Sequence, residues 1–313
     1  MRVTFLGTSG AVPTTQRNTS ALLVNRDGDR LLFDCGEGTQ RQMMRFSTGF
    51  AVDHIFVTHC HGDHVLGIPG LVQTFDFNDR ERPLAVHAPH GTRGKIEDLV
   101  HAAGNDPSFP VRVTQVGPDE VVLDREEYEV RAVRTDHRTN AVGYAVVEDD
   151  RKGRFDREKA EEELGLPPGP EYSQLHRGEP VEHQGRTIQP EEVVGPPRPG
   201  RRLVYTGDTR PTDAVAAAAE DADLLVHDAT FASDWADRAR ETAHSTAREA
   251  AAIADRAGAK RLALTHISTR YAGDHSPIER EAREHFDGDA WVPDDGEKLE
   301  VPFPDDAEGN DDV

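Results

Sequence analysis

The sequence predicts an α/β fold in which two β-rich halves pack face to face, with helices outside and a projecting, flexible insertion. Short apolar, strand-like runs fill the first half of the chain and return after residue 200. Helical patterns accompany the runs in both halves. Between the halves, residues 149–199 are charged, rich in Pro and Gly and poor in core residues, which is unusual for an internal loop of a compact domain.

Eight apolar runs bounded by Gly, Pro, Asn or Asp are expected to form the strands of the first half. They are residues 2–7, 20–25, 30–36, 54–59, 84–89, 111–116, 127–133 and 143–148. Helices are expected near 39–46, 66–75 and 93–103.

The second half has the same alternation of strands and helices. Strands are expected at 202–208, 222–228 and 261–268, and helices at 211–219, 245–257 and 276–286. The helix at 245–257 begins at a good capping residue and ends at a glycine, and Pro277 suits the first turn of the last helix.

The domain boundaries follow from these patterns. We expect residues 1–148 and 200–303 to be two halves of one domain and residues 149–199 to be an insertion in it. The remaining residues, 304–313, are acidic and expected to be disordered.

The composition favours a soluble, cytoplasmic protein without a membrane partner. The 313 residues start directly with a strand-like run, and no apolar stretch approaches the roughly 18 residues that a membrane span needs. Two isolated cysteines, Cys35 and Cys60, do not make a disulfide framework, so a reducing compartment is expected.

The net charge is −22, from 58 acidic and 36 basic residues, of which only five are lysine. This balance is typical of a surface adapted to high salt, although an ordinary acidic protein with an acidic tail fits it as well. The charge weighs against a polyanionic substrate. Nucleic acid would therefore have to bind at a local basic patch, or in salt that screens the repulsion.

The stretch "VTHCHGDHVLG" places four metal-type ligands directly after an apolar strand: His59, His61, Asp63 and His64. Residues two apart in an extended chain point the same way, so His59 and His61 are expected to act together. Asp63 and His64 follow the turn at Gly62 and can face a second position. Four ligands from so short a loop crowd one tetrahedral ion and fit two ions better.

Three further ligand candidates also follow apolar strand-like runs: His137, Asp208 and His266. Asp208 stands in a Gly-Asp turn, where a carboxylate can bridge two ions. His227 and His244 remain open as functional or structural residues. The other histidines are expected to be surface or structural: His87, His90, His101, His176, His183, His275 and His285.

With these ligands the sequence resembles the metallo-β-lactamase superfamily, whose H-x-H-x-D-H signature matches His59, His61, Asp63 and His64. Within it, the chain is most similar to the ribonuclease Z family, endonucleases that remove the 3′ trailer of precursor tRNA. The supporting stretches are "FLGTSGAVPT", "LLFDCGEGTQRQM", "YTGDTRP", "HDATF", "HST" and "THISTRY". "LGLPPGPEYSQLHRGEPV" resembles the Gly-Pro-containing arm with which this family grips tRNA.

The resemblance implies an αββα sandwich with two zinc ions per subunit at one edge. One ion would take His59, His61 and His137, and the other Asp63, His64 and His266, with Asp208 bridging. Asp63 would also accept the proton of the attacking water, Asp228 would orient His244 near the leaving group, and Asp34 would orient a ligand histidine.

The substrate implied is precursor tRNA, bound by a homodimer in which one subunit's arm serves the other's site. The expected contacts are Arg17 and Asn18 near the start, and Lys152, Arg154, Gly169, Pro170 and Arg177 in the arm. Two positions depart from the family pattern: Asp228 replaces a glutamate, and Thr15 replaces a lysine expected to contact phosphate or the RNA 3′ end.

Two other classes of function remain as alternatives. The chain could be a small-molecule phosphodiesterase or arylsulfatase-like enzyme whose insertion serves dimerisation, or an RNA-binding scaffold with a degenerate site. The presence of all seven ligand candidates disfavours the scaffold. For the insertion, a merely solvated mixed-charge helix face is the alternative to an RNA-backbone grip.

Overall fold

A computed structural model describes residues 1–102, 104 and 106–307, and divides the chain into two compact units. The larger unit, the body, comprises residues 1–147 and 201–302. The smaller unit, the arm, comprises residues 148–200 and the segment that begins at Phe303. Each unit has its own hydrophobic core, so each is described by itself.

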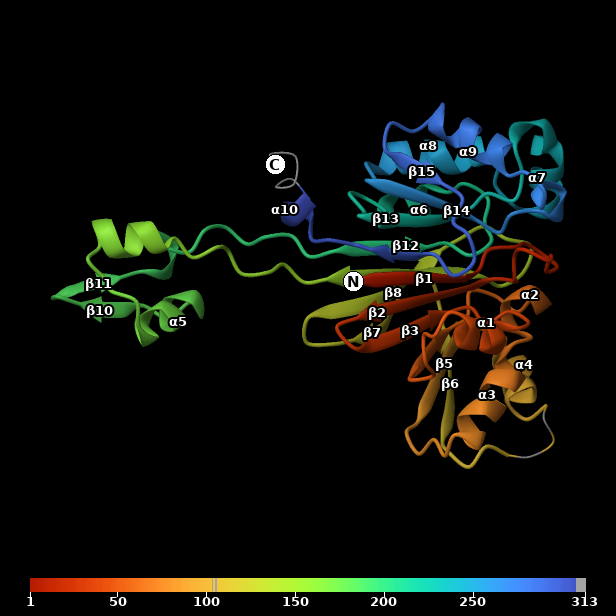
Figure 1. Cartoon of the computed structure of the whole chain (residues 1–313), viewed down its shortest axis with the longest axis horizontal. Helices are drawn as coiled ribbons and strands as arrows, with labels where there is room; N and C mark the ends of the chain where they lie inside the picture. Colours follow the sequence, from red (N-terminus) through yellow and green to blue (C-terminus); the bar gives the residue numbers. More distant parts are fainter. Residues whose placement is uncertain (103, 105, 308–313) are drawn as a thin grey trace. The chain divides into compact units, whose positions relative to one another are not determined.

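The body contains two seven-stranded sheets (Figure 1). The first has the order β16 (Lys298–Glu300), β1 (Arg2–Gly7), β2 (Ala21–Arg26), β3 (Asp29–Phe33), β4 (His54–Phe56), β5 (Leu84–Pro89) and β6 (Val111–Val116). The second has the order β15 (Asp289–Trp291), β14 (Arg261–Thr265), β13 (Leu224–Asp228), β12 (Arg202–Tyr205), β9 (Val142–Glu148), β8 (Tyr128–Arg134) and β7 (Val121–Asp124).

Helices cover the outer faces of both sheets (Figure 1). Those packed on the first sheet are α1 (Thr39–Arg45), α3 (Ile68–Phe77) and α4 (Arg93–Val100). Those packed on the second are α6 (Asp213–Ala218), α8 (Ala247–Ala257) and α9 (Ser276–Arg283). Two short helices, α2 (Gly62–Val65) and α7 (Ala236–Thr242), follow strands near the edge where the ligands gather.

The alternation of side chains along the strands explains the layers. On β12, Leu203 and Tyr205 point into the core between the two sheets, whereas Val204 points outward to the core under α8. On β3, Leu31 points inward and Leu32 outward, to the core under α1 and α3. Each sheet is therefore buried on both faces, and the predicted αββα sandwich of the metallo-β-lactamase fold is confirmed.

The arm is built around a small core of its own. It contains a π-helical turn (Lys159–Glu163), α5 (Pro170–His176), the hairpin β10 (Val181–His183) with β11 (Arg186–Ile188), and a 3₁₀ turn (Pro190–Glu192). Its buried residues are Ala160, Leu166, Leu175, Val181, Ile188 and Val193. The segment was expected to be poor in core residues, but these six are enough to give it a core separate from the body.

Two details of the arm bear on the sequence-based interpretations. The alternative of a mixed-charge helix face does not describe residues 151–156, which are not helical: Arg151 pairs with Arg198, and Phe155 with Val194, in isolated antiparallel bridges. The disordered tail expected from residue 304 is wrong for its first four residues, which form α10 (Pro304–Ala307). The rest of that tail, 308–313, lies outside the described residues.

Across the part of the chain that the structure describes, we find no helix with the length and apolar character needed to span a membrane.

Candidate metal centre

The ligand candidates converge because they follow strands whose ends meet at one edge of the body. β3 to β6 run parallel in the first sheet, and β12 to β14 in the second, so their carboxyl ends gather there. His59 and His61 lie in the loop after β4, whose single helical turn α2 then carries Asp63 and His64. The other three ligands, His137, Asp208 and His266, follow β8, β12 and β14.

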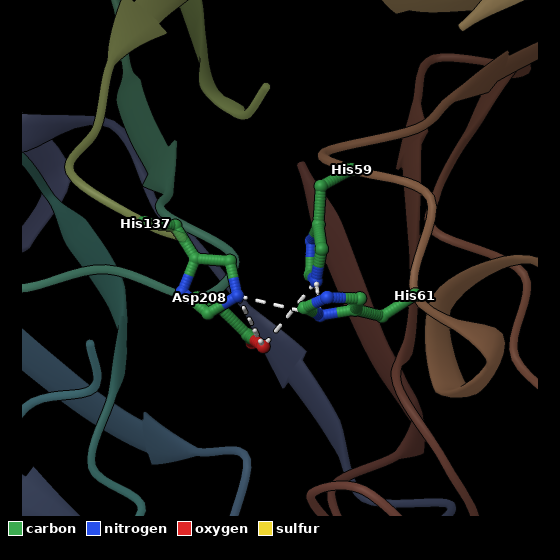
Figure 2. Close-up of side chains that lie close together, drawn as sticks. All are labelled: His59, His61, His137 and Asp208. Atoms are coloured by element: carbon green, nitrogen blue, oxygen red, sulfur yellow. Dashed lines mark hydrogen bonds and ion pairs between the residues drawn. The ribbon is translucent and has the colours of Figure 1, made fainter. Parts of the chain in front are cut away.

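Three histidines form the first group of ligands, together with Asp208 (Figure 2). The Nε2 atom of His59 lies 2.9 Å from Nδ1 of His61, which lies 3.3 Å from Nε2 of His137. One ligand atom from each of these residues lies within 4.8 Å of the others. Burial, followed by the neighbouring His64, holds the pKa of His59 well below its usual value. Burial, followed by His137, lowers the pKa of His61. Both rings are therefore neutral and can offer a lone pair.

Asp63, His64 and His266 form the second group. The Asp63 Oδ2 atom lies 3.2 Å from Nε2 of His266 and 3.5 Å from Nε2 of His64. Burial of Asp63 opposes its charge, but hydrogen bonds with His266 and His64 hold its pKa well below the usual value. The carboxylate is therefore ionised.

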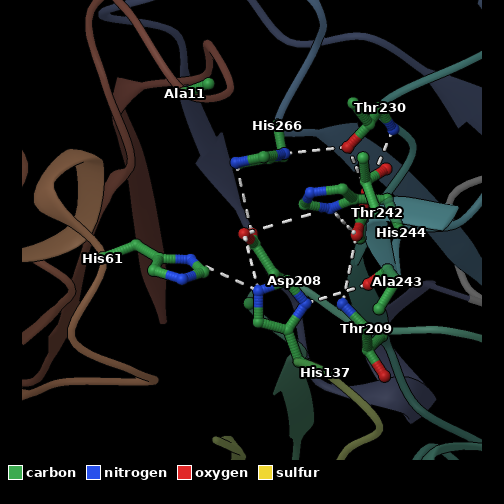
Figure 3. A network of polar contacts seen from close by, with 12 residues as sticks. Ala11, His61, His137, Asp208, Thr209, Thr230, Thr242, Ala243, His244 and His266 are labelled. Atoms are coloured by element: carbon green, nitrogen blue, oxygen red, sulfur yellow. Dashed lines mark hydrogen bonds and ion pairs between the residues drawn. The ribbon is translucent and has the colours of Figure 1, made fainter. Parts of the chain in front are cut away.

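Asp208 connects the two groups because its two oxygens face different sides. Oδ2 lies 3.4 Å from Nε2 of His59, in the first group. Oδ1 lies 3.3 Å from Nε2 of both His64 and His266, in the second. Figure 3 shows the side chain of Asp208 between those of His137 and His266. The sequence-predicted ligand set is thus brought together as two groups joined by one carboxylate.

The buried polar atoms of this centre fit a divalent metal ion. Among the described residues, His64 Nε2 and Asp208 Oδ1 face each other without a hydrogen bond, although both are buried. Burial opposes a charge on His64, yet Asp208 and Asp34 raise its pKa well above the usual value. The two carboxylates therefore favour positive charge at this ring. Imidazole and carboxylate donors suit zinc and related transition metals.

A further set of contacts orients the ligands from behind. The fully buried Asp34 carboxylate lies 2.7 Å from Nδ1 of His64 and accepts hydrogen bonds from Thr58 and Tyr205. His137 Nδ1 lies 2.9 Å from the carbonyl oxygen of Ala243. These contacts leave the other ring nitrogen of each histidine for a metal.

His244 is held beside the centre by Asp228. Its Nδ1 lies 2.9 Å from Asp228 Oδ2, so the carboxylate, shorter than the glutamate that the family resemblance implies, still reaches the ring. Asp228 also accepts hydrogen bonds from Thr230 N and Oγ1 and from Thr209 N, which fix its orientation. Burial lowers the pKa of His244, but Asp228 and then Asp208 outweigh it and raise the pKa to about 9.

Arg17, one of the expected substrate contacts, does not fit that role. Its guanidinium is buried and donates hydrogen bonds to Thr8 Oγ1, the Pro293 carbonyl oxygen and Asp294. It therefore holds the first loop of the body in place. Asn18 is half-buried and donates from its side chain to the carbonyl oxygen of Glu37.

The expected contacts in the arm lie on the surface of that unit. Lys152, Arg154, Pro170 and Arg177 are exposed, and Gly169 is half-buried. Arg177 pairs with Glu179 at 3.3 Å.

Sequence reasoning missed several supporting residues of the centre. Tyr205 and Thr58 were not singled out, although Tyr205 stands inside the quoted "YTGDTRP" stretch. Arg210, from the same stretch, donates to the carbonyl oxygen of His244 and pairs with Glu249 at the start of α8. Its position two residues after the predicted ligand Asp208 could have indicated that Arg210 supports the centre.

Comparisons with known proteins agree with this fold. A family model described as "Beta-lactamase superfamily domain" matches residues 178–267, and one described as "Anti-Pycsar protein Apyc1" matches residues 1–150. The chain is 70% identical over 305 residues to a ribonuclease Z of Haloarcula marismortui, covering 97% of this chain and 98% of that protein. It is 51% identical over 306 residues to a ribonuclease Z of Myxococcus xanthus, covering 97% of this chain and 99% of that protein.

A solved structure of human tRNase Z, short form, is also similar. It matches with a TM-score of 0.69 and 27% sequence identity, over 97% of this chain and 100% of that one. Because the high-identity relatives match both the body and the arm, the chain belongs to the ribonuclease Z family.

Proposed function

We propose that this chain is a zinc-dependent endoribonuclease that removes the 3′ trailer from precursor tRNA. Cleavage leaves a 3′-hydroxyl on the tRNA and a 5′-phosphate on the trailer. The observation that carries the proposal is the convergence of five histidines on the carboxylate of Asp208, with Asp63 beside two of them and His244 held next to the centre. The relatives named ribonuclease Z, similar over nearly the whole chain, support the substrate class.

The residues present would hold two zinc ions. His59, His61 and His137 would bind one, and Asp63, His64 and His266 the other, with Asp208 shared. Bound zinc lowers the pKa of water and neutralises charge that develops on a phosphate.

Asp63 is placed to orient the attacking water. Its ionised Oδ2 accepts a hydrogen bond from the Ala11 backbone at 2.7 Å and lies beside His266. A carboxylate fixed in this way can also accept a hydrogen bond from water and take its proton during attack. The Ala11 loop, which follows β1, thus sets the orientation of Asp63.

His244 is placed to serve the leaving group. Because the phosphate stays on the trailer, the atom that departs is the 3′-oxygen of the last tRNA nucleotide. Asp228 holds one ring nitrogen of His244, which leaves the other nitrogen to donate a proton to that oxygen. Geometry supports this role, since His244 also lies 3.9 Å from Asp208.

The arm is proposed to grip the tRNA away from the scissile bond. Its exposed basic side chains include Lys152, Arg154 and Arg177, and the Gly169–Pro170 pair begins α5. Contacts with phosphates fix the register of an RNA without reading its sequence. We also propose that the protein works as a cytoplasmic homodimer in which one subunit's arm serves the other subunit's site.

Deletion of residues 152–197 tests the substrate class. We expect the variant to lose cleavage of precursor tRNA but to keep hydrolysis of bis(p-nitrophenyl) phosphate, since all seven ligands lie in the body. A variant that still cleaves precursor tRNA, or that loses both activities while remaining folded by circular dichroism, would refute the proposed role of the arm. Hydrolysis of small phosphodiesters without cleavage of precursor tRNA by the intact chain would favour the phosphodiesterase alternative.

Mapping of product ends tests the reaction itself. The intact chain is incubated with zinc and a tRNA that carries a 3′ trailer. A 3′-hydroxyl at the end of the tRNA and a 5′-phosphate on the trailer are expected. A 3′-phosphate or a 2′,3′-cyclic phosphate on the tRNA would overturn the proposed direction of cleavage.

A further inference from the structure

Three arginines of the arm converge on one carboxylate of the segment that follows the body. Asp305 Oδ2 lies 2.9 Å from Nη1 of Arg198 and 3.3 Å from Nη2 of Arg154. Its other oxygen, Oδ1, accepts a hydrogen bond from Nη2 of Arg151. The three guanidinium groups therefore share the two oxygens of a single anion.

The backbone forces two of these arginines together. Arg151 and Arg198 are direct partners in an antiparallel bridge, joined by backbone hydrogen bonds of 2.7 and 2.8 Å. Like charges directly opposite each other destabilise such a pair. An arginine pair at this position is also unexpected by composition in a chain of net charge −22. The arrangement is costly unless an anion is bound between the two side chains.

The chemistry of the cluster fits a phosphodiester as well as it fits a carboxylate. A backbone phosphate of RNA presents two non-bridging oxygens and one negative charge, as Asp305 does. Arginine is the residue that binds such paired oxygens with directed N–H groups. The Arg151 guanidinium also lies over the Phe303 ring, 3.5 Å from its centroid, which brings the segment carrying Asp305 onto the cluster.

We propose that Arg151, Arg154 and Arg198 form a binding site for a phosphodiester group of the RNA backbone, and that Asp305 occupies this site as an intramolecular phosphate mimic. The segment then competes with RNA for the arm. This inference rests on the proposed function.

The alternative is that Asp305 only neutralises the arginine pair and stabilises the arm. The two interpretations predict opposite effects of removing Asp305 on the affinity for RNA. If Asp305 is a competitor, its removal strengthens RNA binding, whereas removal of an arginine weakens it. If Asp305 is a clamp, both changes disturb the arm and weaken RNA binding.

The experiment compares Asp305→Asn, Arg198→Gln and the double variant with the intact chain, using a precursor tRNA with a 3′ trailer. Of the three arginines only Arg154 is fully exposed, and Asp305, Arg151 and Arg198 are partly buried. We expect Asp305→Asn to lower KM about three- to tenfold with kcat unchanged. Arg198→Gln should raise KM by a similar factor, and the double variant should resemble Arg198→Gln. The gain from Asp305→Asn should shrink as KCl is raised, because salt screens both competing contacts.

Asp213→Asn serves as the matched control. It removes one negative charge and breaks an exposed aspartate–arginine pair, with Arg256, in the body. An equal fall in KM for this variant would show an effect of net charge alone and overturn the inference, as would an unchanged or higher KM for Asp305→Asn. Failure of the intact chain to cleave precursor tRNA would instead refute the proposed function, so the two failures are distinguishable.

Discussion

At the scale of single residues, the position of Asp208 depends on the glycine before it. Gly207 has a φ of +59°, and a Cβ at this position would lie 2.7 Å from the Thr58 side chain. The Gly-Asp turn after a strand allowed Asp208 to be predicted as a ligand. The close approach to Thr58 was not predictable, because Thr58 belongs to the other sheet and is brought there only by packing.

Two other residues of the centre show what sequence patterns cannot supply. Asp34 and His266 have φ values of +56° and +60°, in a region that residues other than glycine rarely adopt. His266 was predicted from its place after a strand, and Asp34 from the family resemblance. Their left-handed backbone is imposed by tertiary contacts and costs of order 1–3 kcal/mol each, which the surrounding structure must offset.

Asp34→Asn is expected to weaken metal binding by about 10- to 100-fold. Asp34 accepts a hydrogen bond from Nδ1–H of His64, whereas an asparagine amide at the same place would donate one to Nδ1. The ring proton of neutral His64 would then move to Nε2. A protonated Nε2 has no free lone pair and cannot bind a metal. Competition with a chromophoric chelator measures the affinity. The control is Tyr205→Phe, which removes only one hydrogen bond to the same carboxylate. Equal affinities for the Asn variant and the intact chain would contradict this role of Asp34.

Asp228→Glu is expected to impair the protein, although the family resemblance implies glutamate here. Asp228 is 1% exposed and already reaches His244 at 2.9 Å, so an extra methylene would have to be accommodated inside a buried contact. We expect a loss of about 1–3 kcal/mol in the free energy of unfolding and a lower kcat for precursor tRNA.

Denaturant unfolding and single-turnover cleavage measure both effects of Asp228→Glu. Asp228→Asn is the companion variant, because it keeps the size of the side chain and removes its charge. A glutamate variant with unchanged stability and higher kcat would show that the site has room for the longer side chain.

At the scale of secondary structure elements, helices and strands with long, regular apolar patterns were predictable from the sequence, and the short strands at sheet edges were not. The eleven predicted strands and six predicted helices are all present, with ends displaced by at most three residues. For α8 the cap predicted at Ser245 is displaced by one residue, to a capping box between Thr246 and Glu249, and the predicted glycine end is confirmed as Gly258 in the left-handed conformation. The strands that were not predicted are β7, β15 and β16 of the body and the hairpin β10–β11 of the arm; they are three or four residues long and lie at sheet edges, where alternation is too brief to detect.

His87 on β5 is expected to make stability depend on pH. It is 5% exposed and stacks on both Phe56 and His54, and its Nε2 lies 3.1 Å from Nδ1 of His54. Burial, and then His54, lower its pKa to about 4. The unfolded chain therefore binds more protons between about pH 6.5 and pH 4, and stability falls as pH falls through this range.

The contribution of His87 is of order 3 kcal/mol across the full range, since one pKa unit corresponds to about 1.4 kcal/mol. Replacement by Phe continues the aromatic stack and removes the titrating group. We expect the melting temperature of His87→Phe to fall less between pH 7 and pH 5 than that of the intact chain. His90→Gln, at an exposed histidine, is the control, and equal slopes for all three proteins would refute the prediction.

At the scale of the whole molecule, composition indicated where the chain divides. The shift to charged, Pro- and Gly-rich sequence was placed at residues 149–199, and the smaller unit contains residues 148–200. That this unit also includes the segment from Phe303 could not be predicted, because the contact joins residues about 150 positions apart in the sequence. An acidic tail was instead expected to remain free of the fold.

The charge of −22 leads to a prediction about salt. Repulsion among excess carboxylates opposes the compact state, and salt above 1 M shortens the screening length from about 10 Å to about 3 Å. We expect the melting temperature to rise between 0.1 and 2 M KCl. An uncharged osmolyte at matched osmolality is the control, because it does not screen charge. A melting temperature that does not depend on KCl would reject the hypothesis of a salt-adapted surface.

The sharing of Asp208 also has a consequence for folding thermodynamics. The ligands come from both sheets, so any ion bound there adds to the apolar contacts and the few hydrogen bonds, such as that from Tyr205 to Asp34, that otherwise join them. The unfolded chain has no such arrangement, so the metal binds only the folded state and the free energy of unfolding depends on the free metal concentration. At a metal concentration of a hundred times Kd, binding adds about 2.7 kcal/mol to the free energy of unfolding. A cell that withdraws the metal would then lower the protein's resistance to unfolding and proteolysis together with its catalysis, so metal supply would govern abundance as well as rate.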